Sequence, residues 1–252
     1  MTRTSIKATV LSACLLGAAL LPAPVPAQEL VAEVEQDAAG GRMTMTMPGS
    51  DTDPDRSVTE ELTFAPWDML QALARDDVVL LMRHGPTDWS KRDATNVAPT
   101  DCENQRIMTE LGERQMYELG ALMVANGLSP GRIVASQWCR NQQTLEAMRA
   151  GMLDADPDAL NGVEVETMAD LNLLLSLQGA PDVAAMRDFI ADWDGGDGDG
   201  PLLIISHFTN IQELTERAVF EGQMLVLDPK DDNRVLGELK LGSAAPDVGH
   251  FQ

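Results

Sequence analysis

The sequence has few cysteines, few histidines and few positive charges, and these shortages exclude several classes of function. Its 252 residues include 3 cysteines and 3 histidines, and 18 lysines and arginines stand against 40 aspartates and glutamates, for a net charge of −22. So acidic a chain is a poor partner for nucleic acids and for anionic membrane surfaces. The cysteines have no matching cluster of histidines, so we expect no zinc site. An anionic ligand would need local positive charge to bind against this field.

The hydrophobic run near the start of the chain is too short to be a comfortable membrane span. It covers residues 8–21, after a positively charged start and before small residues that suit cleavage. This pattern is typical of a secretory signal peptide over residues 1–27, cleaved near Ala27. It predicts a periplasmic or secreted bacterial protein. A lipoprotein cleavage box at residues 11–14 is the alternative, but most of the hydrophobic run follows Cys14, so a lipid anchor there is the weaker interpretation.

The composition changes again before the globular part begins. Residues 28–62 are acidic and rich in Asp, Thr, Met and Pro, without a sustained period, which favours a linker or a loosely docked extension. Within it, residues 43–48 could form a short edge strand. We expect one domain over residues 63–252.

Two continuous apolar runs, at residues 78–82 and 202–206, are typical of strands buried on both faces. Further strand patterns and a closing hairpin are expected at 132–136, 163–167, 224–227 and 235–239, and helical patterns at 66–75, 109–126, 141–150, 181–193 and 211–219. Alternating strands and helices predict an α/β fold, a three-layer α/β/α sandwich with a mostly parallel sheet.

Both continuous apolar strands end at a histidine. His84 follows Arg83, and His207 follows the second strand, while the strand at 132–136 ends shortly before Arg140. Because the carboxyl ends of parallel strands form the ligand crevice of an α/β sheet, we expect two histidines and two arginines to converge there. Guanidinium groups suit phosphate oxygens and a neutral imidazole can act as nucleophile, so the pattern favours phosphoryl transfer.

Two cysteines, Cys102 and Cys139, remain once the predicted signal peptide is removed. An even pair in an exported chain favours a disulfide over two free thiols.

Four segments resemble the phosphoglycerate mutases and related phosphatases of the histidine phosphatase superfamily. They follow in the family's order at residues 81–91, 106–112, 136–144 and 205–211. Residues 101–106, with Cys139 beside Arg140, further resemble a group of small exported bacterial members. The resemblance runs from about residue 66 to residue 241, and it implies the phosphoglycerate mutase-like fold.

The resemblance also implies roles for individual residues. His84 would become phosphorylated, and His207 would hold phosphoryl oxygens together with the arginines. The phosphate-binding positions are Arg83, Arg140, Asn210 and Ser90, of which Ser90 stands where the family usually has asparagine. The family's chemistry needs no metal or other cofactor, because guanidinium and imidazole groups supply the positive charge.

The sequence departs from the family at the general acid, the group that protonates the leaving oxygen. Leu173 stands where many members have glutamate, and Phe208 stands where the other branch has aspartate. Asp170 is a tentative substitute, although a helix cap or a solvated loop acid is the stronger interpretation of that residue.

These features favour an exported phosphomonoesterase that acts on a small phosphorylated substrate. The alternatives are a catalytically degenerate protein that binds phosphate or a phosphorylated ligand and, less favoured, a phosphomutase. The walls of the site are expected in residues 86–104 and 151–185, which carry no motif for a particular substrate.

Overall fold

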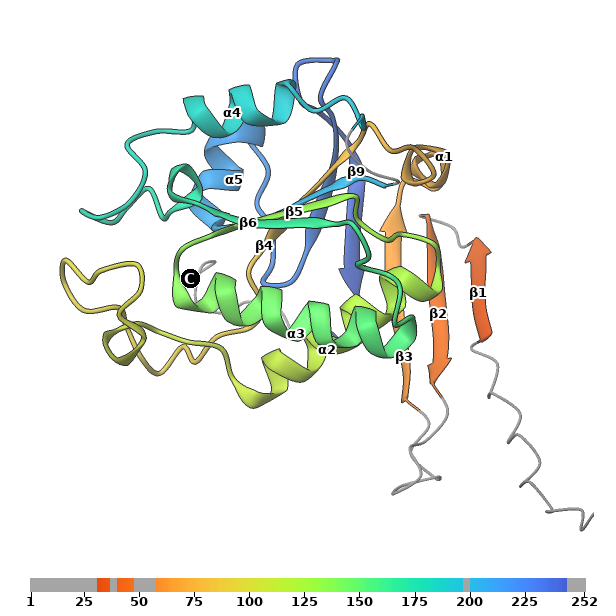
Figure 1. Ribbon diagram of the computed structural model, residues 1–252, viewed down its shortest axis with the longest axis horizontal. Helices are drawn as coiled ribbons and strands as arrows, with labels where there is room; N and C mark the ends of the chain where they lie inside the picture. Colours follow the sequence, from red (N-terminus) through yellow and green to blue (C-terminus); the bar gives the residue numbers. More distant parts are fainter. Residues whose placement is uncertain (1–30, 37–39, 48–57, 197–199, 244–252) are drawn as a thin grey trace, which may run out of the picture.

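The computed structural model describes residues 31–36, 40–47, 58–196 and 200–243, and Figure 1 shows a sheet with helices on both of its faces. The predicted signal peptide, its cleavage site and Cys14 lie outside these residues. Within the described part of the chain, no helix combines the length and the apolar character that crossing a bilayer requires.

Nine strands form one sheet in the order β1-β2-β3-β9-β8-β4-β7-β5-β6. Their bounds are β1 Val31–Gln36, β2 Gly41–Met47, β3 Val58–Ala65, β4 Val79–Arg83, β5 Arg132–Ser136, β6 Glu164–Met168, β7 Leu202–Ser206, β8 Met224–Asp228 and β9 Arg234–Leu241. Strands β4, β7, β5 and β6 pair in parallel, and the other neighbouring pairs are antiparallel. The predicted α/β class is confirmed, but the sheet is mixed. The prediction of parallel pairing holds only for the half of the described sheet formed by β4, β7, β5 and β6.

The antiparallel half includes residues that the sequence assigned to a linker or extension. Within 28–62, the side chains of Met43, Met45 and Leu62 are at most 2% exposed, and they pack in one core cluster with Leu239 of β9. The methionines alternate with threonines, so they point to the same face of β2. Strand β2 is paired on both sides and is not an edge strand. The described residues of this stretch are therefore part of the domain, which corrects the expectation of a linker.

The described helices are α1 Leu70–Leu73, α2 Glu110–Ala125, α3 Cys139–Ala155, α4 Ala184–Ala191 and α5 Phe208–Thr215, with short 3₁₀ helices η1 Trp67–Met69, η2 Cys102–Asn104 and η3 Ala169–Leu171. Helices α2 and α3 lie on one side of the sheet, and α4 and α5 lie on the other (Figure 1). Helix α2 begins as predicted, because the Thr109 side chain caps it by accepting the N–H of Gly112 at 2.9 Å.

Strand β4 shows how the three layers are held together. All five of its residues are buried. Leu80 and Met82 belong to the core cluster that contains α2 and α3, whereas Val79 and Leu81 belong to the cluster that contains α4 and α5. Successive side chains of a strand point to opposite faces, so an unbroken apolar run requires helices on both. This packing fixes the carboxyl end of β4, where the candidate site begins.

Candidate active site

The carboxyl ends of β4 and β7 place two histidines next to each other. The strands pair in parallel with Arg83 opposite Ser206, so the residues that follow, His84 and His207, stand at the same edge of the sheet. The N–H of His84 donates to the carbonyl of Ser206 at 3.1 Å. The two rings meet edge to face, with centroids 5.6 Å apart. The sequence therefore placed the two histidines correctly.

The His84 ring is oriented by its own neighbour. Its Nδ1 lies 2.9 Å from the carbonyl oxygen of Gly85, and because a carbonyl can only accept, Nδ1 carries the proton and Nε2 has the free lone pair. Burial, followed by the positive charges of Arg140 and Arg83, holds the pKa of His84 well below its ordinary value. A neutral ring with an unprotonated Nε2 is the form that can attack phosphorus.

Arg83 is fully buried, and its guanidinium is held from two sides. One terminal nitrogen donates to the carbonyl of Val219 at 2.9 Å, and the other lies 3.5 Å from Oε1 of Glu221. The guanidinium also lies over the ring of Phe208, 5.2 Å from its centroid. Phe208 stands where the resemblance described above implies an acid in one branch, and here its ring packs against an arginine instead.

Arg140 lies in the first turn of α3 and is also buried. Its Nη1 contacts both carboxylate oxygens of Asp93 at 3.1 Å, and its guanidinium lies 4.8 Å from the ring of Trp138. Burial lowers the pKa of Arg140 to about 10, although Asp93 opposes the shift. The group stays charged at neutral pH, so it can bind an anion.

His207 has one ring nitrogen bound and one without a partner. Its Nε2 lies 3.0 Å from Oγ of Ser136, which also contacts Oδ1 of Asn172 at 2.9 Å. Its buried Nδ1 has no hydrogen-bond partner within the described part of the chain. Burial, and then the charges of Arg140 and Arg83, hold the pKa of His207 well below its ordinary value. A buried unpartnered ring nitrogen beside two arginines is a place where an anionic oxygen could bind.

Three charged residues of the site were missed by the sequence analysis. Arg106 lies 3.6 Å from the ring centroid of Trp89, with one terminal nitrogen 4.0 Å from Glu221. Glu221 and Asp93 are the carboxylates that contact the arginines of the site. Arg106 follows the Cys102 segment, which was a usable signal. Nothing in the sequence marked Asp93 or Glu221, because their partners are distant along the chain.

The remaining predicted site residues lie outside this group of contacts. Asn210 is buried, and its Nδ2 donates to the carbonyl of Asn172 at 2.9 Å. This bond connects α5 to the loop that follows η3. Ser90 is exposed, and its hydroxyl bonds Asp88 at 2.6 Å. Asp170 is exposed in η3. Their roles in phosphate binding or proton transfer stay predictions.

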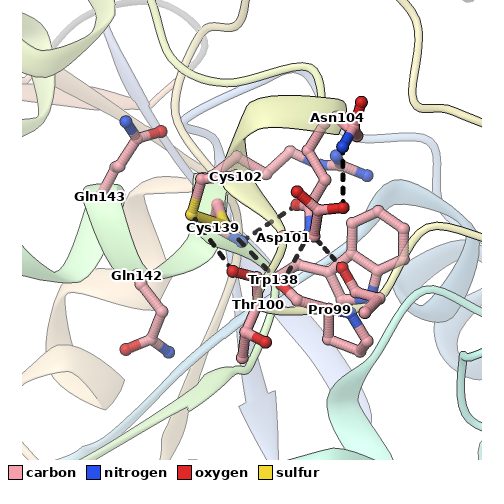
Figure 2. The surroundings of a disulfide bond; sticks show 12 residues. Pro99, Thr100, Asp101, Cys102, Asn104, Trp138, Cys139, Gln142 and Gln143 are labelled. Atoms are coloured by element: carbon pink, nitrogen blue, oxygen red, sulfur yellow. Dashed lines mark hydrogen bonds between the residues drawn. A yellow bond between two sulfur atoms is a disulfide. The ribbon is translucent and has the colours of Figure 1, made fainter.

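The predicted disulfide between Cys102 and Cys139 is present, and Figure 2 shows it beside residues 99–101. Gln105 adds a second tie, because its Oε1 accepts the N–H of Cys139 at 3.1 Å. Its Nε2 donates to the carbonyls of Ala98 and Pro99 at 2.8 and 2.7 Å. The loop that carries Asp93 is thereby fastened to the start of α3. Among the described residues, no three His, Cys, Asp or Glu side chains are grouped to hold a metal ion.

A comparison with known protein families matches the part of the chain that carries Arg83, His84 and Arg140. Residues 79–171 match the family described as the histidine phosphatase superfamily (branch 1). The match includes Arg83, His84 and Arg140 and ends before His207. No curated protein sequence matches the chain.

Several solved structures are similar to this chain. The protein histidine phosphatase SixA complexed with tungstate is 20% identical, with a TM-score of 0.44, over 65% of this chain and 94% of that chain. The putative phosphohistidine phosphatase SixA from Agrobacterium tumefaciens is 17% identical, with a TM-score of 0.42, over 60% and 91%. A mycobacterial glucosyl-3-phosphoglycerate phosphatase is 15% identical, with a TM-score of 0.39, over 67% and 99%. Identities this low assign no substrate.

Proposed function

Because residues 79–171 match the histidine phosphatase superfamily, we propose that this chain belongs to that superfamily and is a phosphomonoesterase that works through a phosphohistidine on His84. The observation that supports the proposal is the state of the His84 ring. It is neutral, its Nδ1 is bound to Gly85, and two buried arginines stand nearby. A nucleophile held in the correct tautomer beside cationic groups is what phosphoryl transfer to nitrogen requires.

In the first step, Nε2 of His84 forms a bond to phosphorus while the bond from phosphorus to the ester oxygen breaks. The leaving oxygen departs with the bonding electrons. Arg83 and Arg140 stabilise the charge on the phosphoryl oxygens that are not exchanged. In the second step, water attacks phosphorus, the N–P bond breaks, inorganic phosphate is released, and His84 returns to its neutral form.

His207 contributes by changing its protonation state. In the free site its pKa is depressed, first by burial and then by the arginines. A phosphate dianion supplies negative charge beside it and favours the protonated ring. The unpartnered Nδ1 then donates to a phosphoryl oxygen, while Nε2 stays on Ser136.

The leaving group receives little help in this site. Leu173 cannot donate a proton, and Asp170 is exposed. The carboxylates of Asp93 and Glu221 are both occupied as hydrogen-bond acceptors. A missing general acid costs roughly 10²- to 10⁴-fold on poor leaving groups. We therefore expect activated esters to react much faster than alkyl phosphates.

The same departure keeps an alternative function open. A protein that retains the cationic groups but lacks an acid could bind phosphate or a phosphorylated ligand without turnover. A phosphomutase is the less favoured alternative within the superfamily. The disulfide supports an oxidising compartment, in agreement with the proposed export to the periplasm or the cell exterior.

An activated aryl phosphate, p-nitrophenyl phosphate, tests the proposal directly. The chain without residues 1–27 should hydrolyse it, and acid-labile phosphate should be trapped on the protein from a radiolabelled substrate. His84→Ala should lose both signals because it removes the nucleophile. Phosphate binding without turnover in the unmutated protein would favour the binding function instead.

A further inference from the structure

Glu221 is a buried carboxylate that the proposed mechanism does not use. It lies between α5 and β8 and is 8% exposed. Its Oε1 accepts the Thr87 hydroxyl at 2.6 Å. Its Oε2 accepts the N–H of Thr87 at 3.2 Å and the indole N–H of Trp89 at 3.1 Å. The Glu221 carboxylate therefore acts as the acceptor in all three hydrogen bonds.

The same oxygen that binds Thr87 also faces the nucleophile. Oε1 of Glu221 lies 4.0 Å from Nδ1 of His84 and 3.5 Å from a terminal nitrogen of Arg83. Nδ1 is the nitrogen that is not available for attack, because it carries the proton donated to Gly85. Glu221 is therefore next to the ring atom that stays protonated throughout the reaction. Among the described residues, Glu221 is the one carboxylate within 4.0 Å of a His84 ring nitrogen.

The reaction on His84 creates an electrostatic difficulty. When Nε2 bonds to phosphorus while Nδ1 keeps its proton, the imidazole becomes an imidazolium and carries a positive charge. The arginines that bind phosphate oppose that charge, as their effect on the unreacted ring already shows. A negative charge about 4 Å from the ring stabilises the imidazolium and offsets part of this opposition.

We propose that Glu221 is a positioning residue that holds Thr87 and Arg83 in place and stabilises the positive charge that His84 gains on phosphorylation. The inference rests on the proposed function, because it concerns the phosphohistidine. It has two consequences of opposite sign. The Glu221 charge favours formation of the phosphorylated ring, but it weakens binding of a phosphate dianion to the neighbouring arginines.

Glu221→Gln separates these consequences. Glutamine keeps the size of the side chain, and its oxygen can still accept from Thr87 and Trp89 while its amide donates to the Thr87 hydroxyl. The kcat for p-nitrophenyl phosphate should fall roughly 10²- to 10³-fold, since a charge about 4 Å from the ring is lost. Inorganic phosphate, measured as a competitive inhibitor, should bind about threefold to tenfold more tightly.

Two further variants make the test specific. Glu238→Gln is the matched control: it removes the same charge from β9, where the carboxylate contacts Gln223 at 2.9 Å, and it should change neither constant. Glu221→Asp keeps the charge but moves it away from the ring, so it should shift both constants in the same directions by less. It also provides the test if the glutamine variant does not fold.

The outcomes distinguish the inference from the function on which it rests. No turnover by the unmutated protein would defeat the proposed function. Turnover by the unmutated protein with an unchanged kcat in Glu221→Gln would defeat the inference alone. Weaker phosphate binding together with a lower kcat would also overturn it, because that result indicates only that the Thr87 loop has come loose.

Discussion

The disulfide between Cys102 and Cys139 gives the most direct test of how the site is held together. Reducing it, or replacing both cysteines by serine, removes a bridge that spans 37 residues. The loop-entropy relation gives about 3.8 kcal/mol for a bridge of this length. In a domain of this size 1 kcal/mol shifts the melting temperature by about 2–4 °C, so the loss should be roughly 8–15 °C.

The location of the bridge predicts a second effect. Cys139 directly precedes Arg140, and the bridged loop leads to Arg106 and contains the tie through Gln105. Once the bridge is open, the Gln105 bonds, the contact between Asp93 and Arg140, and the bond from Nη1 of Arg140 to the carbonyl of Arg106 still connect this loop to α3. Binding of inorganic phosphate should therefore weaken together with the loss of stability, because Arg140 loses part of its support.

Circular dichroism melting with and without a phosphine reductant measures the first effect, and inhibition by inorganic phosphate measures the second. The double serine variant is the control, since reductant should not change it further. A shift of less than about 2 °C would contradict the entropic reasoning. A full loss of stability with unchanged phosphate inhibition would contradict the link to Arg140.

The remaining predictions concern protonation. Burial lowers the pKa of both His84 and His207 in the folded protein. Below about pH 6.5 these histidines are therefore protonated in the unfolded chain but stay neutral in the folded one. The free energy of unfolding should consequently fall by up to about 1.4 kcal/mol per pH unit for each histidine as the pH decreases. Urea unfolding at pH 7.5 and 5.5 measures this, and His207→Gln should show a weaker pH dependence than the unmutated protein; equal slopes would refute the assignment. Asp170→Asn should not change the rates on aryl or alkyl phosphates, because the side chain is exposed; a loss confined to alkyl phosphates would make Asp170 the acid.

The central strands and the two histidines could be predicted because their signals are local. The runs at 78–82 and 202–206 are apolar at every position, and each histidine directly follows its strand. Strand β2 shows the opposite case. Its alternating methionines were visible, but a half-apolar strand needs a partner, and its core neighbour Leu239 lies nearly at the other end of the sequence.

The contacts of the carboxylates Glu221 and Asp93 could not be predicted from the sequence for the same reason. Glu221 contacts Thr87, which precedes it by 134 residues, and Asp93 contacts Arg140 across 47 residues. No spacing rule connects residues so far apart, and a glutamate after a helix resembles any solvated residue. The sequence therefore identified the cationic side of the site and missed the carboxylates that balance it.

The position of β9 between β3 and β8 has a consequence for the order in which the molecule can fold. Strand β3 joins the rest of the sheet through β9, and the Thr63 hydroxyl bonds the carbonyl of Lys240 across 177 residues. Until β9 has been made, β1, β2 and β3 can pair with one another but not with the rest of the sheet. Contacts this distant slow folding because a long loop must close first. The first three strands of the chain can therefore join the rest of the sheet only after its last strand has been made.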